Sequence, residues 1–194
     1  MKRTLIAGLV GGIVIFVWSA IAHTILPIGT MGVDVLPSDE AVLPTLQQAV
    51  TEPGLYFFPG IDMSGNATPE EQQAWDEAYR AGPIGLLIYS PTGKEPMPAS
   101  TLILEFLTTL AAALFAAWVL GLIPGTFGRR VAVATLFGVV GWLSISVSEW
   151  IWYPYPGAYI IGVGLDQVIG WLLGGLAMAA LLRPKATEAS YSAV

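Results

Sequence analysis

Four long apolar stretches constrain this chain more than any other feature of its sequence. They cover Thr4–Pro27, Ser100–Ile123, Val131–Trp152 and Tyr159–Leu182. Each reaches the roughly 20 residues that cross about 30 Å of hydrocarbon at about 1.5 Å of helical rise per residue. The 194 residues are 55% hydrophobic and 11% charged, which is typical of membrane proteins. We therefore expect an all-α membrane protein, a bundle of four transmembrane helices in contact with the lipid bilayer.

The first stretch also fits a secretory signal, because Lys2 and Arg3 precede it and Ser19–Ala22 resembles a small-residue cleavage site. We expect it to be retained as a span. The chain's other cations outside the segment between the first two spans are Arg129, Arg130, Arg183 and Lys185. Lys and Arg in short loops stay on the cytoplasmic side, so both termini are expected there.

The segment between the first two spans carries ten of the acidic residues, so we expect it outside the cytoplasm. Its sequence predicts a small α+β domain. Ser38 is placed to cap a helix that ends near Val50, and Thr68 to cap a second helix that ends at Gly82. The apolar runs 55–58 and 84–89 predict strands. The expected organisation is a first span over 1–27, an extracytoplasmic acidic α+β cap over 28–98, three further spans over 99–183, and a disordered cytoplasmic tail over 184–194.

Small residues recur at a spacing of four in two of the spans. Gly8 and Gly12 share one helix face, as do Gly170 and Gly174, which allows neighbouring backbones to approach closely. A compact four-helix bundle accounts for these residues, and a self-association face is the alternative.

Ionisable residues inside the spans are the candidate functional residues, because a charge at bilayer depth is costly unless it is paired or hydrated. The predicted intramembrane polar cluster consists of His23, Glu105, Glu149, Asp166 and Gln167. Three interpretations stay open: acids that pin the cap onto the bundle, a proton or cation path, and a site for a hard divalent metal. The sequence lacks the paired Glu-x-x-His spacing of carboxylate di-metal bundles, so we predict no metal.

His23 is the single histidine, and the chain has no cysteine. A within-chain bis-His haem, a multi-His zinc site and thiolate sites are therefore excluded. The small residues before His23 resemble the pigment-ligating segment of bacterial light-harvesting antenna polypeptides. No cofactor is predicted, and the alternative is a (bacterio)chlorophyll or haem held by His23.

Several segments together resemble a family of small four-span proteins of the bacterial inner membrane that has no assigned activity. They are the end of the first span (18–23), the Pro- and Gly-bounded runs 53–60 and 82–91, the aromatic loop 152–156, and the segment 166–171. The resemblance implies four spans and a location in the bacterial cytoplasmic (inner) membrane, and it transfers no functional residue.

No nucleophile–base pair, phosphate-binding loop or metal motif is visible, so we expect a protein that is not an enzyme. A sequence pI near 4.6, with the acids outside, argues against nucleic acid as a partner. We expect an accessory subunit that binds and stabilises a larger bacterial membrane complex, an electron-transfer or photosynthetic one for example, with other membrane subunits as partners. The alternative is a membrane protein that binds an ion, a proton, a small ligand or a pigment at the polar cluster.

Overall fold

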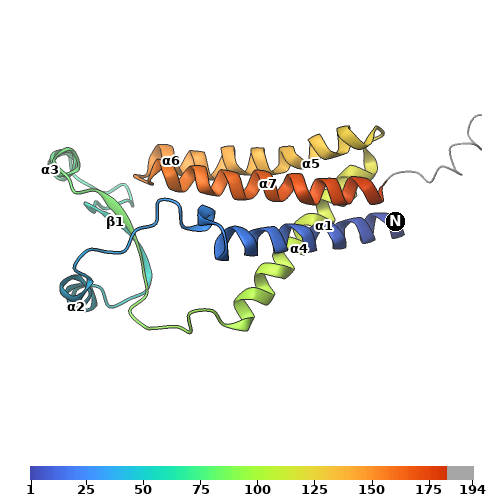
Figure 1. Ribbon diagram of the computed structural model, residues 1–194. Helices are drawn as coiled ribbons and strands as arrows, with labels where there is room; N and C mark the ends of the chain where they lie inside the picture. Colours follow the sequence, from blue (N-terminus) through green and yellow to red (C-terminus); the bar gives the residue numbers. More distant parts are fainter. Residues whose placement is uncertain (183–194) are drawn as a thin grey trace, which may run out of the picture. The chain divides into compact units, whose positions relative to one another are not determined.

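The computed structural model describes residues 1–182, which form two compact units (Figure 1). The helical unit contains residues 1–33, 97–148 and 156–182, and the sheet unit contains residues 34–96 and 149–155. Each unit is described by itself. The tail expected over 184–194, and the cations Arg183 and Lys185, lie outside the described residues.

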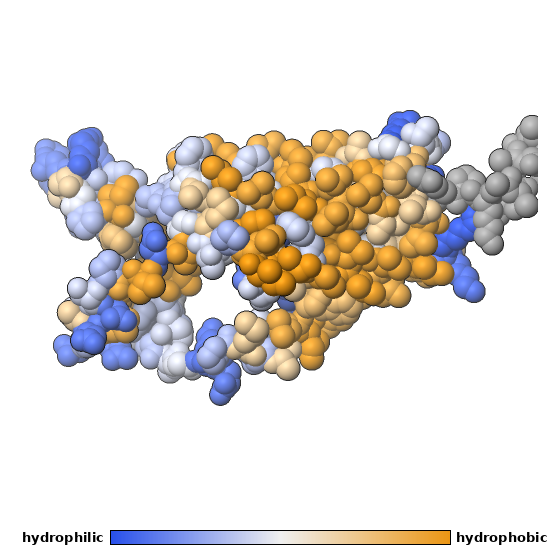
Figure 2. Space-filling view, viewed as in Figure 1, coloured by the Kyte–Doolittle hydropathy of each residue, from blue (hydrophilic) through white to orange (hydrophobic). Residues whose placement is uncertain are grey.

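The helical unit contains three of the predicted spans and most of the third one along the chain. The four spans are α1 (Lys2–Thr24), α4 (Ala99–Leu122), the continuous segment Phe127–Trp152 and α7 (Gly157–Leu181). The third span comprises α5 (Phe127–Gly141), the π-helical segment η2 (Trp142–Val147) and α6 (Ser148–Trp152), the last of which belongs mostly to the sheet unit. All four are long and apolar enough to cross a membrane, and Figure 2 shows apolar surface over the helical unit. The chain is a multi-pass membrane protein.

The four spans pack in the order α4, α1, α7, α5, with extensive contacts between each pair of neighbours and few between α4 and α5. In an apolar 18-residue stretch of each span, 28% of the stretch is buried for α1 and 33% for α7. The buried share is 17% for each of the other two spans. The inner positions of α1 and α7 explain that difference. The spans therefore form a bundle whose two end members, α4 and α5, make few contacts with each other.

Neighbouring spans run antiparallel, which brings the cationic ends together. Thr4 of α1 lies beside Gly121 at the end of α4, and Arg130 of α5 donates a hydrogen bond of 2.8 Å to the carbonyl of Leu182 after α7. Lys2, Arg3 and Arg129 therefore lie at the same end of the helical unit as Arg130. This is the charge clustering from which the positive-inside rule assigns a side.

The sheet unit combines two short strands with two helices. The elements are α2 (Asp39–Ala49), β1 (Gly54–Phe58), α3 (Pro69–Ala81) and β2 (Gly85–Tyr89). The strands pair antiparallel, with Gly54 opposite Tyr89 and Phe58 opposite Gly85. Both strands and both helices were predicted from the sequence, and the structure confirms them.

The start of α3 shows why its prediction succeeded. The Thr68 hydroxyl accepts a hydrogen bond from the Glu71 backbone N–H, and the Glu71 carboxylate accepts one of 2.8 Å from the Thr68 backbone N–H. This reciprocal capping box satisfies two backbone donors that a helix start otherwise leaves unpaired. Gly82, with φ of 70°, ends the helix as predicted.

The capping role predicted for Ser38 is wrong. Ser38 does precede α2, but its side chain makes no capping hydrogen bond. Its backbone is left-handed, with φ of 57° and ψ of 41°, whereas a capping residue is normally extended so that its side chain turns back onto the helix. Asp39 takes over part of the role, since its carboxylate accepts a hydrogen bond of 2.8 Å from the Glu40 N–H.

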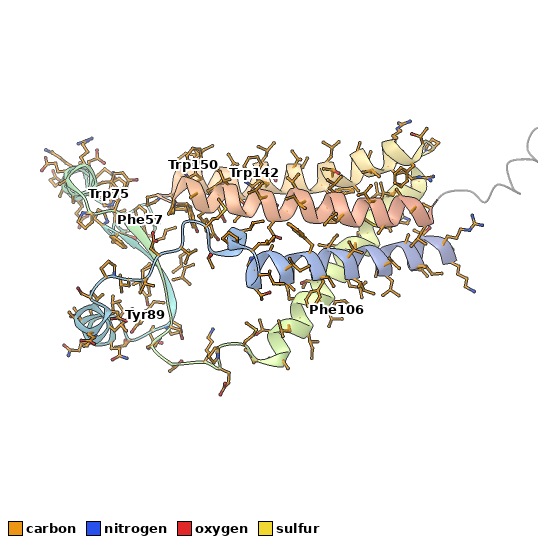
Figure 3. The ribbon with its side chains drawn as sticks, viewed as in Figure 1. Phe57, Trp75, Tyr89, Phe106, Trp142 and Trp150 are labelled. Carbon is orange, nitrogen blue, oxygen red and sulfur yellow. The ribbon has the colours of Figure 1, made fainter. Side chains whose placement is uncertain are left out.

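Aromatic side chains hold the sheet unit together. Tyr79 of α3 lies against Phe57 of β1 and Trp75, with ring centroids 6.1 and 5.1 Å apart. The Trp75 indole N–H also donates a hydrogen bond of 2.9 Å to the Pro59 carbonyl, and Figure 3 labels Phe57 and Trp75.

In the loop between β1 and α3, hydrogen bonds from the Ser64 hydroxyl and backbone N–H hold the pKa of Asp62 below its usual value.

Candidate functional site

The close packing of α1 against α7 positions the candidate site. Gly174 leaves room for Ile15, since a Cβ there would lie 2.6 Å from an Ile15 side-chain atom. One turn earlier on α7, a Cβ at Gly170 would lie 3.1 Å from the Trp18 indole. Two of the predicted packing glycines therefore lie on this interface. Small residues at both points allow the two helices to approach until polar groups can bond across them.

Two hydrogen bonds join α1 to Asp166 of α7. The Trp18 indole N–H donates to the Asp166 backbone carbonyl at 3.0 Å. The Ser19 hydroxyl donates to Oδ2 of the Asp166 carboxyl group at 3.5 Å, which is a long hydrogen bond. Trp18 therefore fixes the backbone of α7 at this level, while Ser19 holds only one of the two carboxyl oxygens, and holds it weakly.

The second oxygen of Asp166 has no such partner. Oδ1 is buried, and among the described residues none donates a hydrogen bond to it. His23 of α1 and Glu105 of α4 both lie close enough to act electrostatically on this carboxyl group. The structure therefore brings three of the predicted cluster residues, His23, Glu105 and Asp166, to one place. A buried carboxyl oxygen without a donor is costly, which makes it the position where a ligand or a proton would be stabilised.

His23 presents one ring nitrogen to its surroundings. Nδ1 lies 2.9 Å from the Ser19 backbone carbonyl. A carbonyl oxygen can only accept, so Nδ1 carries the proton and Nε2 is the atom left for a proton or a ligand. Gly29, in the 3₁₀-helical segment η1 (Pro27–Thr30), packs directly on the imidazole, because a Cβ at Gly29 would overlap the ring.

Two cavities in the helical unit meet at His23 and Asp166. The larger, of about 450 Å³, opens between α1 and α4 and is lined by Phe16, Ser19, Ala20, His23, Thr24, Met97, Leu102, Glu105 and Asp166. The smaller, of about 250 Å³, lies between α1, η1 and α7 and is lined by His23, Ile28, Gly29, Tyr159, Gly162, Val163, Asp166 and Gln167. The carboxyl group and the imidazole therefore form the shared wall of two cavities.

The larger cavity exists because α1 and α4 approach closely along only part of their length. Gly8 packs on Leu114 and Gly12 on Leu110, where an added Cβ would lie 2.9 and 3.0 Å from the backbone of α4. One turn further along α1, the ring of Phe16 meets Phe106 edge-on, with centroids 5.3 Å apart. The two rings separate the helices, and α4 diverges from α1 beyond them (Figures 1 and 3).

The π-helical segment η2 shapes the opposite side of α7. The Trp142 indole N–H donates a hydrogen bond of 2.9 Å to the Ile160 carbonyl, and its ring lies on Gly164. Gln167, a member of the predicted cluster, lines the smaller cavity, and its side-chain oxygen lies beside Gly141 at the end of α5. Gln167 therefore links the smaller cavity to the third span.

Glu149 is the one member of the predicted cluster that lines neither cavity. It lies at the start of α6, is exposed, and belongs to the sheet unit. In the sequence, Glu149 lies about as many residues from the end of its span as the other cluster members do from theirs, which is why it was grouped with them. In the structure, its segment makes its contacts within the sheet unit.

The described residues contain no group of three or more His, Cys, Asp or Glu side chains arranged to hold a metal ion. The larger cavity still presents two carboxyl groups, an imidazole and the hydroxyl groups of Ser19 and Thr24. Such a set can exchange protons, and it can bind a positively charged group by charge-assisted hydrogen bonds.

Sequence reasoning missed the side chains that build the cavity. Phe16 and Ala20 continue the face of Gly8 and Gly12 at the same four-residue spacing, so extending that face by two turns would have found them. Trp18 and Ser19 gave no comparable signal, because their role depends on how α1 is rotated against α7.

No family model, curated protein or solved structure matches this chain. The family resemblance stated above therefore stays a prediction. The proposals below rest on this chain's own residues and geometry.

Proposed function

We propose that this protein binds a cation within the membrane, with Asp166 as the central anionic group. The observation that carries the proposal is the buried Oδ1 of Asp166, which no described donor satisfies, at the junction of two cavities. In a low-dielectric setting, an unpaired carboxylate is strongly stabilised by a bound positive charge or by a proton.

The surrounding groups support a cation over an anion. Asp166 and Glu105 both line the larger cavity, and among residues 1–182 His23 is the only basic side chain that lines it. An anion would have to displace or neutralise two carboxyl groups before it could bind. A cation would meet charges of the opposite sign, which favours its entry and its retention.

Thermal unfolding of the purified full-length protein tests this proposal. A panel of inorganic cations and organic amines would be added to the protein in mild detergent. A ligand that binds only the folded state stabilises it by about 2.7 kcal/mol at a hundred times its dissociation constant. We expect at least one class of cation to raise the midpoint of unfolding.

Asp166→Asn and Glu149→Gln form a matched pair of variants for this test. Both remove one carboxylate from a span and keep the size of the side chain. The stabilisation should vanish in Asp166→Asn and persist in Glu149→Gln, which lines neither cavity. Stabilisation that survives Asp166→Asn unchanged would contradict the proposal, as would the absence of any stabilising cation.

A second function is supported by the outer face of α4. Phe115 and Trp118 expose 72% and 59% of their surface, and together with Ala111 and Leu114 they line an apolar groove of about 480 Å³. We propose that a transmembrane helix of a larger complex packs here, so that the protein acts as an accessory subunit. Aromatic side chains beside small ones suit helix packing in lipid.

Isolation of the tagged protein in mild detergent tests the subunit role. A partner protein should co-purify with the wild type and be lost from Phe115→Ala/Trp118→Ala. The matched control is Leu107→Ala, which removes another exposed apolar side chain from α4 outside this groove. A lone protein with only lipid bound would contradict this second proposal.

We propose further that the cationic end of the helical unit faces the cytoplasm, that the sheet unit is extracytoplasmic, and that the membrane is a bacterial inner membrane. The gathering of Lys2, Arg3, Arg129 and Arg130 supports this orientation. Because the chain has no cysteine, single cysteines at Ser64 and Gly128 can be labelled selectively. An impermeant thiol reagent should label Ser64→Cys, and not Gly128→Cys, in intact cells; the reverse pattern would invert the orientation.

A further inference from the structure

We infer that the ligand of the larger cavity is an amphipathic organic cation that enters sideways from the membrane, between α1 and α4. This inference rests on the proposed cation-binding function and specifies the class of ligand. The geometry that carries it is a cavity with carboxyl groups on two of its walls and the ring of Phe16 at its inner end, where that ring packs on Phe106.

The two carboxyl groups come from different helices. Asp166 is held on α7, next to Ser19 of α1. Glu105 is on α4, where its carboxylate accepts a hydrogen bond of 3.4 Å from the Thr109 hydroxyl. A positive group between the two walls would contact one fixed carboxyl group and one carried by the diverging helix. A ligand with one compact positive centre suits this arrangement.

The dimensions of the cavity favour an organic cation over a bare metal ion. A metal ion such as Ca²⁺ needs six or more oxygen ligands at about 2.3–2.6 Å. The described residues offer no group of three His, Cys, Asp or Glu side chains so arranged. A volume of about 450 Å³ instead falls in the range of pockets for small organic molecules, which is roughly 300–1,000 Å³.

The remaining lining explains why the ligand would be amphipathic. Ala20, Met97 and Leu102 give apolar walls, and Phe16 stands at the inner end against Phe106. Aromatic rings attract cations through their negative faces, and they also pack on apolar groups. On the lipid side, Ile103 and Leu104 of α4 are exposed. A molecule with an apolar body can therefore reach the carboxyl groups from the hydrocarbon.

Binding of radiolabelled tetraphenylphosphonium to the full-length protein in lipid nanodiscs tests this inference. Protein-free nanodiscs give the background of partition into lipid. Saturable binding is expected for the wild type and for Glu149→Gln. Asp166→Asn should weaken it by about thirtyfold or more, because that carboxyl group is partly buried. Glu105→Gln should weaken it by about threefold, because Glu105 is more exposed.

Tetraphenylborate is the matched control ligand, since it has nearly the same shape and the opposite charge. It should neither bind saturably nor compete with tetraphenylphosphonium. Saturable binding of both ions, or binding of tetraphenylphosphonium that Asp166→Asn leaves unchanged, would show that only an apolar surface is involved and would overturn the inference.

The same nanodiscs separate failure of the inference from failure of the proposed function. If sodium, potassium or calcium stabilises the protein in an Asp166-dependent way while tetraphenylphosphonium does not bind, the inference falls and the cation-binding function stands. If no cation of either kind depends on Asp166, both fall.

Discussion

Helix α1 packs on two neighbours, and the two interfaces differ in how far they stay closed. Against α7, contact continues from Gly174 opposite Ile15, through Gly170 opposite Trp18, to Asp166 opposite Ser19. Against α4, contact is equally close at Gly8 and Gly12, and it widens after the Phe16–Phe106 pair. One helix therefore forms a seam with α7 that stays closed as far as Asp166, and a seam with α4 that opens after the Phe16–Phe106 pair.

The difference shows how the size of interface side chains determines where two membrane helices pack closely and where a cavity remains between them. In lipid there is no hydrophobic force between apolar helices, so close approach depends on small residues that allow dense packing. On the α7 side, glycines of α7 receive the large side chains of α1. On the α4 side, two large rings meet each other, and neither helix provides a glycine at that level. The cavity lined by His23, Glu105 and Asp166 is the consequence.

The largest expected effect comes from forcing the α1–α7 seam apart. In Gly174→Leu, the new side chain meets Ile15 and the backbone of Gly11, so we expect a loss of about 3 kcal/mol in unfolding free energy. Gly128→Leu is the control, because a Cβ there has no neighbour within 4 Å. Thermal unfolding in detergent measures both, and an equal loss in the two variants would break the comparison.

Removing one ring should convert the open interface into a closed one. Phe106→Ala should let α4 approach α1 beyond Gly12, at a cost of about 2 kcal/mol because the ring is only partly buried. A disulfide needs Cα atoms about 4.4–6.8 Å apart, so cysteines introduced at Ala20 and Leu102 report the distance. Cross-linking should be faster in Phe106→Ala than in the parent pair. An unchanged rate would show that the rings do not hold α4 away.

Two tryptophans make a smaller and sharper test. Trp18 and Trp142 each donate an indole hydrogen bond to a backbone carbonyl of α7, at 3.0 and 2.9 Å. Replacing either by Phe should cost about 1 kcal/mol, measured by thermal unfolding. Only Trp18→Phe should also weaken cation binding, because only Trp18 bonds to Asp166. Equal effects of the two variants on binding would show that the packing of α1 on α7 does not determine cation binding at Asp166.

The four spans, both strands and the ends of α3 could be predicted because each has a local cause. Apolar length, short apolar runs bounded by turn residues, and the Thr68–Glu71 capping box are all properties of contiguous sequence. The location of Ser38 before α2 was also predictable, but its left-handed backbone was not, because that conformation depends on the preceding chain.

The candidate site was predictable only in part. The cost of charge in a span singled out His23, Glu105 and Asp166, which the structure brings together, and Glu149, which it does not. Depth can be counted from the sequence, whereas the rotation of a helix that is apolar on all sides cannot. That rotation decides which residues face the cavity, and so the contacts of Trp18 and Ser19 with Asp166 were found only in the structure.

The central claim is that a cavity with a negatively charged wall lies between α1 and α4 at Asp166. Charge-selective thiol labelling tests it directly, because Ala20→Cys places a single thiol on the cavity wall of a chain that has no cysteine. We predict that a cationic methanethiosulfonate reagent modifies this thiol faster than an anionic one of similar size, and that Asp166→Asn removes the preference. Equal rates with both reagents in the presence of Asp166, or no reaction with either, would contradict the account.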